Sequence, residues 1–116
     1  MPFQLKWTEE AVKGYEALKS AADAAVRNRA KSSRSKSSRQ EGLFKQVAGA
    51  IAKLKENPRH PSLNCHHYSD LPNPYAPKDK VWEAYAQNKT PGAYRIFWCY
   101  GPGKAWITIL AITPHP

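Results

Sequence analysis

One arginine, Arg95, stands inside the most apolar stretch of the chain, residues 94–100, which read Tyr-Arg-Ile-Phe-Trp-Cys-Tyr. A guanidinium stays charged at every pH that a protein normally meets. A charge placed in such a strand needs either a partner or a functional role. Glu83, in an earlier aromatic stretch, is the candidate partner for a structural ion pair. Arg95 is therefore the first candidate for a functional residue.

Histidines are the next candidates, because an imidazole can act as acid or base near neutral pH. His115 follows the last apolar stretch, and His66 and His67 follow Cys65. Neighbouring residues on a strand point to opposite faces, so this pair is poorly suited to bind one metal ion. No second ligand pair has the spacing of a zinc site. We therefore expect neither a metal ion nor a cofactor.

The chain is strongly basic, with a formal net charge of +9. Six of these charges fall in residues 27–39, which also hold five serines and no acidic residue. Such a stretch is typical of a solvated linker, or of an arm that binds phosphates of RNA. Two helices that extend as a basic hairpin are a further alternative. The nucleic-acid-binding candidates here are Arg34, Lys36 and Arg39.

A second basic group, Lys53, Lys55, Arg59 and His60, lies where the second predicted helix ends. These side chains are candidates for binding phosphates. The alternative is a solvated helix end, since positive charge is favourable at a helix C-terminus.

Apolar periodicity predicts one domain, residues 1–116, of the α+β class. The expected order is β-α-α-β-β-β, a mainly antiparallel four-stranded sheet with two helices packed on one face. A basic, serine-rich insertion separates the helices at about 28–40. The predicted strands cover residues 3–7, 81–86, 94–100 and 106–112, and the predicted helices run from about 9 to 27 and from about 43 to 56. The last two strands flank a Gly/Pro turn and are expected to form a β-hairpin. Because residues 94–100 are apolar on both faces, we expect this strand to be covered on each side.

The first helix has a clear start signal. Thr8 is a suitable N-cap, and Trp7 and Val12 occupy the two positions of a hydrophobic staple. Its expected core stripe consists of Val12, Tyr15, Leu18, Ala22 and Ala25. The corresponding stripe of the second helix consists of Leu43, Phe44, Val47, Ala48, Ile51 and Leu54.

Composition also bears on location. The chain contains two cysteines without a spacing pattern, which favours a reduced compartment. It shows neither a signal peptide nor an apolar run of the ~20 residues needed to cross a bilayer. We expect a cytoplasmic protein that does not enter a membrane.

The ordered set of motifs resembles the RelE/ParE superfamily of bacterial type II toxins. Residues 54–63 are similar to the exit from the second helix, L-x-x-N-P-x-x-P-x-L, and residues 81–85 to the first strand of the meander. Residues 93–98 resemble the x-Y-R-I strand, and residues 107–115 the last strand with its trailing basic residue or histidine. The resemblance covers the chain except for the basic stretch.

The resemblance implies a toxin that cleaves mRNA on the ribosome without a metal and inhibits translation, and that binds a cognate antitoxin. Attack of a 2′-hydroxyl on the adjacent phosphate needs a base, an acid and cations. By resemblance, Arg95 stabilises the phosphate and His115 transfers a proton, so these two are the catalytic candidates. The residues expected to contact RNA are Lys53, Lys55, Arg59, His60 and His67, with the basic stretch.

A second class of function stays open. Many active relatives continue past the position of His115 with a tyrosine or a further helix, whereas Pro116 follows it here. The alternative is therefore a non-enzymatic protein, either a ParE-like inhibitor of DNA gyrase or a family member that only binds antitoxin or nucleic acid.

Overall fold

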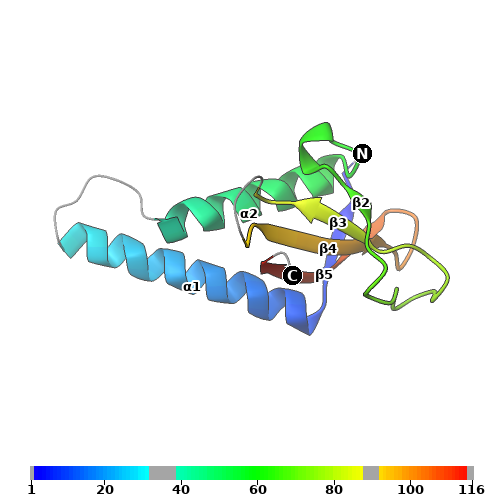
Figure 1. The fold of residues 1–116 in the computed structure, drawn as a ribbon, viewed down its shortest axis with the longest axis horizontal. Coiled ribbons are helices and arrows are strands. Elements are labelled where there is room, and N and C mark those ends of the chain that lie inside the picture. The colour runs from blue at the N-terminus through cyan, green and yellow to red at the C-terminus, as the bar shows by residue number, and fades with distance from the viewer. Residues whose placement is uncertain (1, 32–38, 88–91, 115–116) are drawn as a thin grey trace.

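The computed structural model describes residues 2–31, 39–87 and 92–114, which form two helices packed on a five-stranded sheet (Figure 1). The sheet order is β1-β5-β4-β3-β2. The pairing of β1 with β5 is parallel and the other three pairings are antiparallel. The elements are β1 (Gln4–Trp7), α1 (Glu9–Lys31), α2 (Arg39–Glu56), the short 3₁₀ helix η1 (Pro61–Leu63), β2 (His66–His67), β3 (Trp82–Tyr85), β4 (Tyr94–Tyr100) and β5 (Trp106–Pro114).

The predicted α+β class and helix-on-sheet arrangement are confirmed, and the sheet has one strand more than expected. The additional strand, β2, has only two residues and pairs with the edge of β3. So short a segment shows no periodicity in sequence, and only its hydrogen bonds to β3 define it.

Strand β4 is the centre of the sheet, and its hairpin with β5 is confirmed. The register shifts at a bulge between Phe97 and Trp98, so that Trp98 faces Ile109. In the turn, Gly101 adopts a φ of 120°, a conformation that favours glycine.

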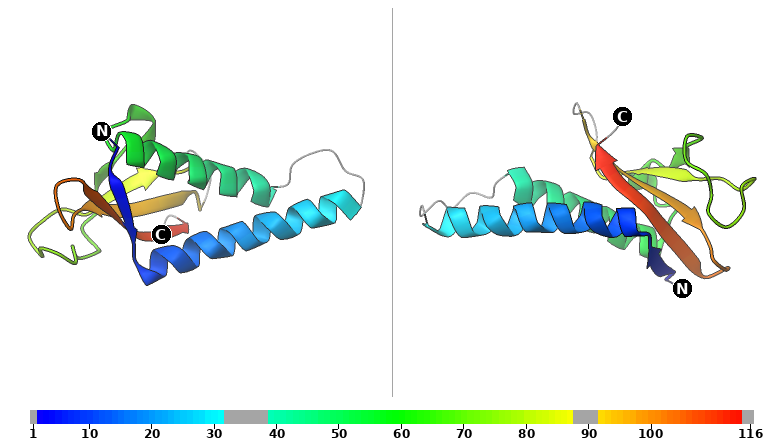
Figure 2. Two further views of the ribbon diagram at one scale, coloured as in Figure 1. Left: turned by 180° about the vertical axis from the view of Figure 1, so that it is seen from behind. Right: turned by 90° about the horizontal axis from the view of Figure 1, so that it is seen from below.

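Helix α1 begins where the sequence predicted and ends later. The Thr8 hydroxyl accepts the Ala11 N–H at 3.1 Å and donates to the Leu110 carbonyl at 2.7 Å, which fixes the helix start to β5. The helix continues to Lys31, because residues 28–31 contain neither glycine nor proline to stop it. The paired helices extend beyond the sheet (Figures 1 and 2).

The predicted staple is wrong. Val12 is 44% exposed, and Trp7 instead packs edge-on against Tyr15 with ring centroids 5.2 Å apart. The buried stripe of α1 starts one position earlier, at Ala11, and continues through Leu18.

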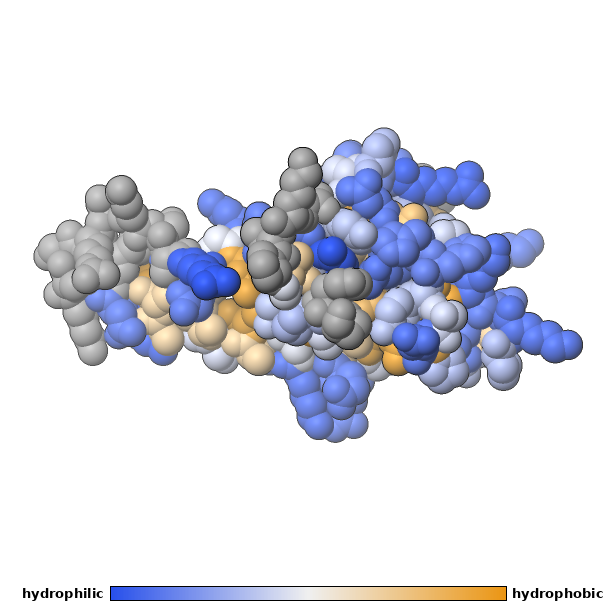
Figure 3. Space-filling view, viewed as in Figure 1, coloured by the Kyte–Doolittle hydropathy of each residue, from blue (hydrophilic) through white to orange (hydrophobic). Residues whose placement is uncertain are grey.

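Apolar surface remains visible mainly over the two helices (Figure 3). No helix of the described residues is long and apolar enough to cross a membrane.

The helix-facing side of the sheet forms the main core. On α2, Val47, Ile51 and Leu54 are buried as the periodicity predicted. They pack in one cluster with strand residues that alternate toward the helices. The strand members of this cluster include Ala84, Ile96, Trp98, Ile107, Ile109 and Ile112.

The opposite side of the sheet is covered over part of its length by the loop 68–80. Tyr68 packs on Phe97 with ring centroids 4.5 Å apart, and the Tyr75 hydroxyl lies 2.8 Å from the Thr108 hydroxyl. Asn73 shapes the loop by accepting the Tyr75 N–H at 2.9 Å. The expectation that β4 is covered on both faces is therefore confirmed, with a loop as the second cover. The start of β4 lies beyond these contacts.

Candidate functional site

Arg95 lies near the start of β4, on the face away from the helices. Its backbone is opposite Tyr85 of β3 and Thr113 of β5. The residue is 7% exposed, and its guanidinium carbon lies 3.7 Å above the centre of the Tyr85 ring. A cation over an aromatic face is stabilised by the ring quadrupole, and more strongly where water is excluded.

Backbone carbonyls engage one side of this guanidinium. Nη1 donates to the Gln87 carbonyl at 2.6 Å and to the Tyr94 carbonyl at 3.3 Å. Nε is buried and has no hydrogen-bond partner among the described residues. The guanidinium is thus held at Nη1, and at least its Nε–H is without an acceptor within residues 2–31, 39–87 and 92–114.

Glu83 shares this face of the sheet and contacts a histidine. Its carboxylate Oε1 lies 2.6 Å from Nε2 of His66, which is paired with it across β2 and β3. Glu83 is 2% exposed, whereas the His66 side chain is 48% exposed. The pair therefore connects a buried carboxylate to solvent through an imidazole.

The second ring nitrogen of His66 also faces an acceptor. Nδ1 lies 3.0 Å from the Asn64 carbonyl oxygen. Both ring nitrogens donate only in the imidazolium form, so two acceptors are satisfied together by a doubly protonated ring. A proton on Glu83 would instead reverse the contact at Nε2. The pair thus places an imidazole in direct contact with a carboxylate, and both side-chain types serve in general acid–base chemistry.

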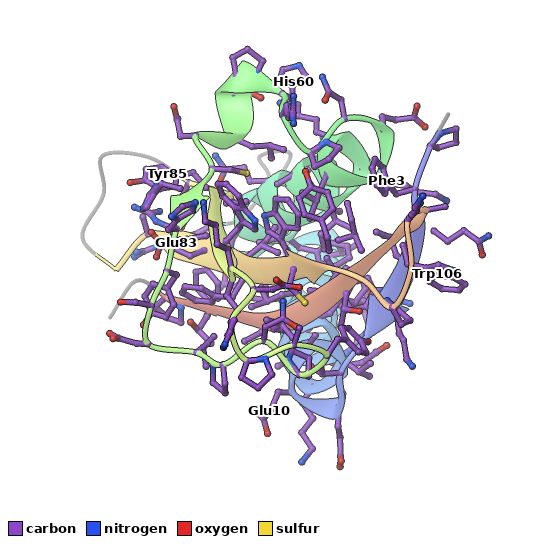
Figure 4. All side chains as sticks on the ribbon, turned by 90° about the vertical axis from the view of Figure 1, so that its right-hand side faces the viewer. Phe3, Glu10, His60, Glu83, Tyr85 and Trp106 are labelled. Carbon is purple, nitrogen blue, oxygen red and sulfur yellow. The ribbon has the colours of Figure 1, made fainter. Side chains whose placement is uncertain are left out.

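These side chains meet because β2, β3 and β4 are adjacent. Glu83 and Tyr85 are two residues apart and point to the same side of β3 (Figure 4). The sequence analysis did not assign His66 or Tyr85 a role. Alternation along residues 81–86 is the signal that would have placed Tyr85 on the same face as Glu83, but only the register of β3 with β4 places it opposite Arg95. Nothing in the sequence indicates that His66 reaches Glu83.

The predicted phosphate-binding group lies elsewhere. Lys53 and Lys55 are exposed in the last turn of α2, and Arg59 and His60 follow them at a cleft lined by Tyr100. Tyr100 is five residues from Arg95, about 16 Å along an extended strand. His60 stands beside η1, apart from Glu83 and Tyr85 (Figure 4). The structure therefore does not bring this group together with Arg95.

The remaining predicted residues are scattered. His67 is exposed and packs edge-on against Trp82 with centroids 4.5 Å apart, on the opposite face from His66 as predicted. Arg39 is exposed at the start of α2, far along that helix from Lys53. His115, Arg34 and Lys36 lie outside the described residues, so their roles stay predictions.

Both cysteines are free thiols with altered acidity. Burial raises the pKa of the Cys99 thiol to about 11. Burial also raises the pKa of the Cys65 thiol, and the indole N–H of Trp98 partly opposes this. Within the described ranges, no three His, Cys, Asp or Glu side chains are grouped so that they could hold a metal ion.

No family model and no curated protein matches this sequence. Solved structures do match over nearly the full length. The YoeB/ParE toxin from Agrobacterium tumefaciens has a TM-score of 0.60 and 12% identity, with 97% of this chain and 99% of that chain covered. The archaeal RelE–RelB complex from Pyrococcus horikoshii OT3 has a TM-score of 0.55 and 16% identity, with 98% of this chain and 96% of that chain covered.

A third match is the intact E. coli RelBE toxin–antitoxin complex, with a TM-score of 0.55, 12% identity and 98% of both chains covered. At such low identity the likeness shows a shared fold alone. The chain therefore has the fold of these RelE and YoeB/ParE toxins, as its motifs predicted.

Proposed function

We propose that this protein is the toxin of a type II toxin–antitoxin system and cleaves mRNA on the ribosome, inhibiting translation in the cytoplasm. The observation that carries the proposal is the grouping of Arg95 with the His66–Glu83 pair on one face of a RelE/ParE fold. Phosphodiester cleavage by a neighbouring hydroxyl requires a cation and proton-transfer groups, and it requires no metal.

In the proposed reaction, the 2′-oxygen of one nucleotide bonds to the adjacent phosphorus and the bond from phosphorus to the 5′-oxygen breaks. One proton leaves the 2′-hydroxyl and one proton reaches the 5′-oxygen. Arg95 stabilises the negative charge that develops on the phosphate oxygens. The His66–Glu83 pair holds a proton that suits the leaving oxygen, and His115 stays the predicted second proton-transfer residue.

Two partners belong to this proposal. The net charge of +9 favours mRNA and ribosomal RNA, because phosphates attract basic proteins over several ångströms. Two of the matching solved structures are complexes, one of RelE with RelB and one the intact RelBE toxin–antitoxin complex. We therefore propose a cognate antitoxin as the protein partner of this chain.

The test is cleavage of ribosome-bound mRNA by the purified protein, mapped by primer extension. The expected result is cleavage that depends on ribosomes and persists in the presence of a metal chelator. Free mRNA serves as the matched substrate control. Absence of any cleavage at a concentration equal to that of the ribosomes would contradict the enzymatic proposal.

One observation favours the non-enzymatic alternative. Arg95 is only 7% exposed and already donates to two carbonyls, as a structural arginine would. A protein that fails to cleave mRNA but inhibits supercoiling by DNA gyrase would be a ParE-like inhibitor. The gyrase assay is therefore run on the same preparation.

A further inference from the structure

A cleft lies on the other face of the sheet, at the end of β4 opposite to Arg95. It has a volume of about 370 Å³ and is formed between the segment 58–65 and the aromatic side chains of Trp82, Trp98 and Tyr100. This volume is at the small end of the range for ligand pockets, roughly 300–1,000 Å³. It suits one planar ring system rather than an extended molecule.

The walls of the cleft are aromatic. Trp82 and Trp98 are nearly parallel, at 18°, with centroids 5.9 Å apart, and Tyr100 meets Trp98 edge-on at 5.0 Å. Tyr100 is 41% exposed, so a large part of its surface remains available to a ligand. Aromatic side chains of this kind bind nucleobases by stacking, which contributes about 1–3 kcal/mol per base.

One polar group in the cleft wall lacks a strong partner. The indole nitrogen of Trp98 is buried and has no hydrogen-bond partner at bonding geometry among the described residues. It interacts with the Cys65 thiol, but sulfur is a weak acceptor, and this thiol itself donates to the Pro58 carbonyl at 3.6 Å. A buried donor of this kind needs an explanation, and an acceptor on a bound ring would supply one.

Positive charge and a further donor stand at the rim. Arg59 is exposed and lines the cleft beside His60. Nδ1 of His60 accepts the Ser62 N–H at 3.1 Å, which leaves Nε2 to carry the ring proton and donate outward. Lys53 and Lys55 are exposed in the preceding helical turn. A phosphate attached to a bound base would meet this group.

We propose that this cleft binds a single nucleobase, with its phosphate at Arg59. The base stacks against the exposed ring of Tyr100, and an acceptor on it receives the Trp98 N–H. The proposal concerns binding, and its test does not depend on whether the protein cleaves mRNA. In a protein that cleaves RNA, the cleft would hold a nucleotide of the strand away from the cut, since it lies on the opposite face from Arg95.

The experiment titrates the full chain with four nucleoside monophosphates, with a trinucleotide RNA and with ribose 5-phosphate. Binding is measured by the change in tryptophan fluorescence and by the heat released, using isothermal titration calorimetry. The expected result is that at least one nucleotide binds about tenfold to a hundredfold more tightly than ribose 5-phosphate, the ratio that stacking of one base predicts. Tighter binding of the trinucleotide would identify an RNA strand as the source. Equal affinity for the trinucleotide and for a single nucleotide would identify a free nucleotide as the source of the bound base.

Two variants locate the site. Tyr100→Ala removes the exposed ring and is expected to abolish the advantage of a nucleotide over ribose 5-phosphate. Arg59→Gln is expected to weaken trinucleotide binding and to lower the slope of log affinity against log salt by about 0.7, the value for one phosphate of a single strand. Lys78 is an exposed lysine of the loop 68–80, and Lys78→Gln is the matched charge control. It is expected to lower the magnitude of this slope by less than Arg59→Gln does.

The proposal is wrong if no nucleotide binds more tightly than ribose 5-phosphate to the folded wild-type protein. It is also wrong if Lys78→Gln lowers binding as much as Arg59→Gln, because the attraction would then be diffuse. Binding of an acidic peptide that Tyr100→Ala abolishes, without any nucleotide binding, would assign the cleft to a protein partner instead.

Discussion

The two ends of β4 hold polar groups in opposite ways. At the start, Arg95 is fixed between carbonyl oxygens and the Tyr85 ring, on the face that carries the His66–Glu83 pair. At the other end, Trp98 presents an N–H without a strong acceptor, on the face that packs against the helices. The first arrangement gathers charged and ionisable side chains, and the second provides aromatic surface. The proposed chemistry and the proposed base recognition thus belong to different faces of one strand.

The largest expected effect is on mRNA cleavage. Arg95→Ala should lower the rate on the ribosome about 10²–10³-fold, because electrostatic stabilisation of the transition state is lost. Arg95→Lys should retain only part of the wild-type cleavage rate, since an ammonium is a point charge and stacks less well on Tyr85. Single-turnover rates measure both, and circular dichroism checks folding. A folded Arg95→Ala protein with the wild-type rate would leave this end of β4 with a structural role only.

The helix-facing core should dominate stability. Leu54→Ala removes a side chain with no exposed surface and should lower the free energy of unfolding by about 2–5 kcal/mol. Val12→Ala is the matched control and should change it by less than about 0.5 kcal/mol, because Val12 is exposed. Urea denaturation measures both. A loss of more than about 1 kcal/mol in Val12→Ala would restore the staple that the sequence predicted.

The His66–Glu83 pair should respond asymmetrically. His66→Ala leaves a buried carboxylate without its imidazole contact, which should cost about 1–3 kcal/mol of stability at neutral pH. Glu83→Gln should cost less, because the half-exposed imidazole can be hydrated. Thermal unfolding of the two variants compares them. Equal losses of stability in the two variants would contradict this asymmetry, because the imidazole would then lose as much without the carboxylate as the carboxylate loses without the imidazole.

The smallest effect is a pH dependence. The pKa of Cys99 is raised to about 11 in the folded state, so its stabilising contribution is present below the unfolded pKa and is lost as pH rises toward about 11. Between about pH 8 and about pH 10 this loss should be on the order of 1 kcal/mol. Urea denaturation of wild type and Cys99→Ala isolates it, since other groups titrate in both. Parallel pH profiles would show that the thiol is not buried from solvent.

Local patterns in the sequence determined the elements of this protein and their order. The aromatic and β-branched residues of 94–100, apolar on both faces, identified a strand in the middle of the sheet. The three- and four-residue spacing of Val47, Ile51 and Leu54 identified the buried side of α2. These features depend on neighbours within a turn or a strand, so they can be deduced from the sequence alone.

Only the tertiary structure decided which groups meet. His66 reaches Glu83 because a two-residue strand pairs with β3, and the paired residues are seventeen positions apart in the chain. Arg59 and His60 border the Tyr100 end of β4, away from Arg95, because the segment after α2 crosses that end of the sheet. Periodicity assigns a residue to a face of its own element, but the partner on another element is fixed by strand register and by the path of loops. Arg95 and the basic group of Lys53, Lys55, Arg59 and His60, which the sequence suggested for one site, therefore lie at two places in the described structure.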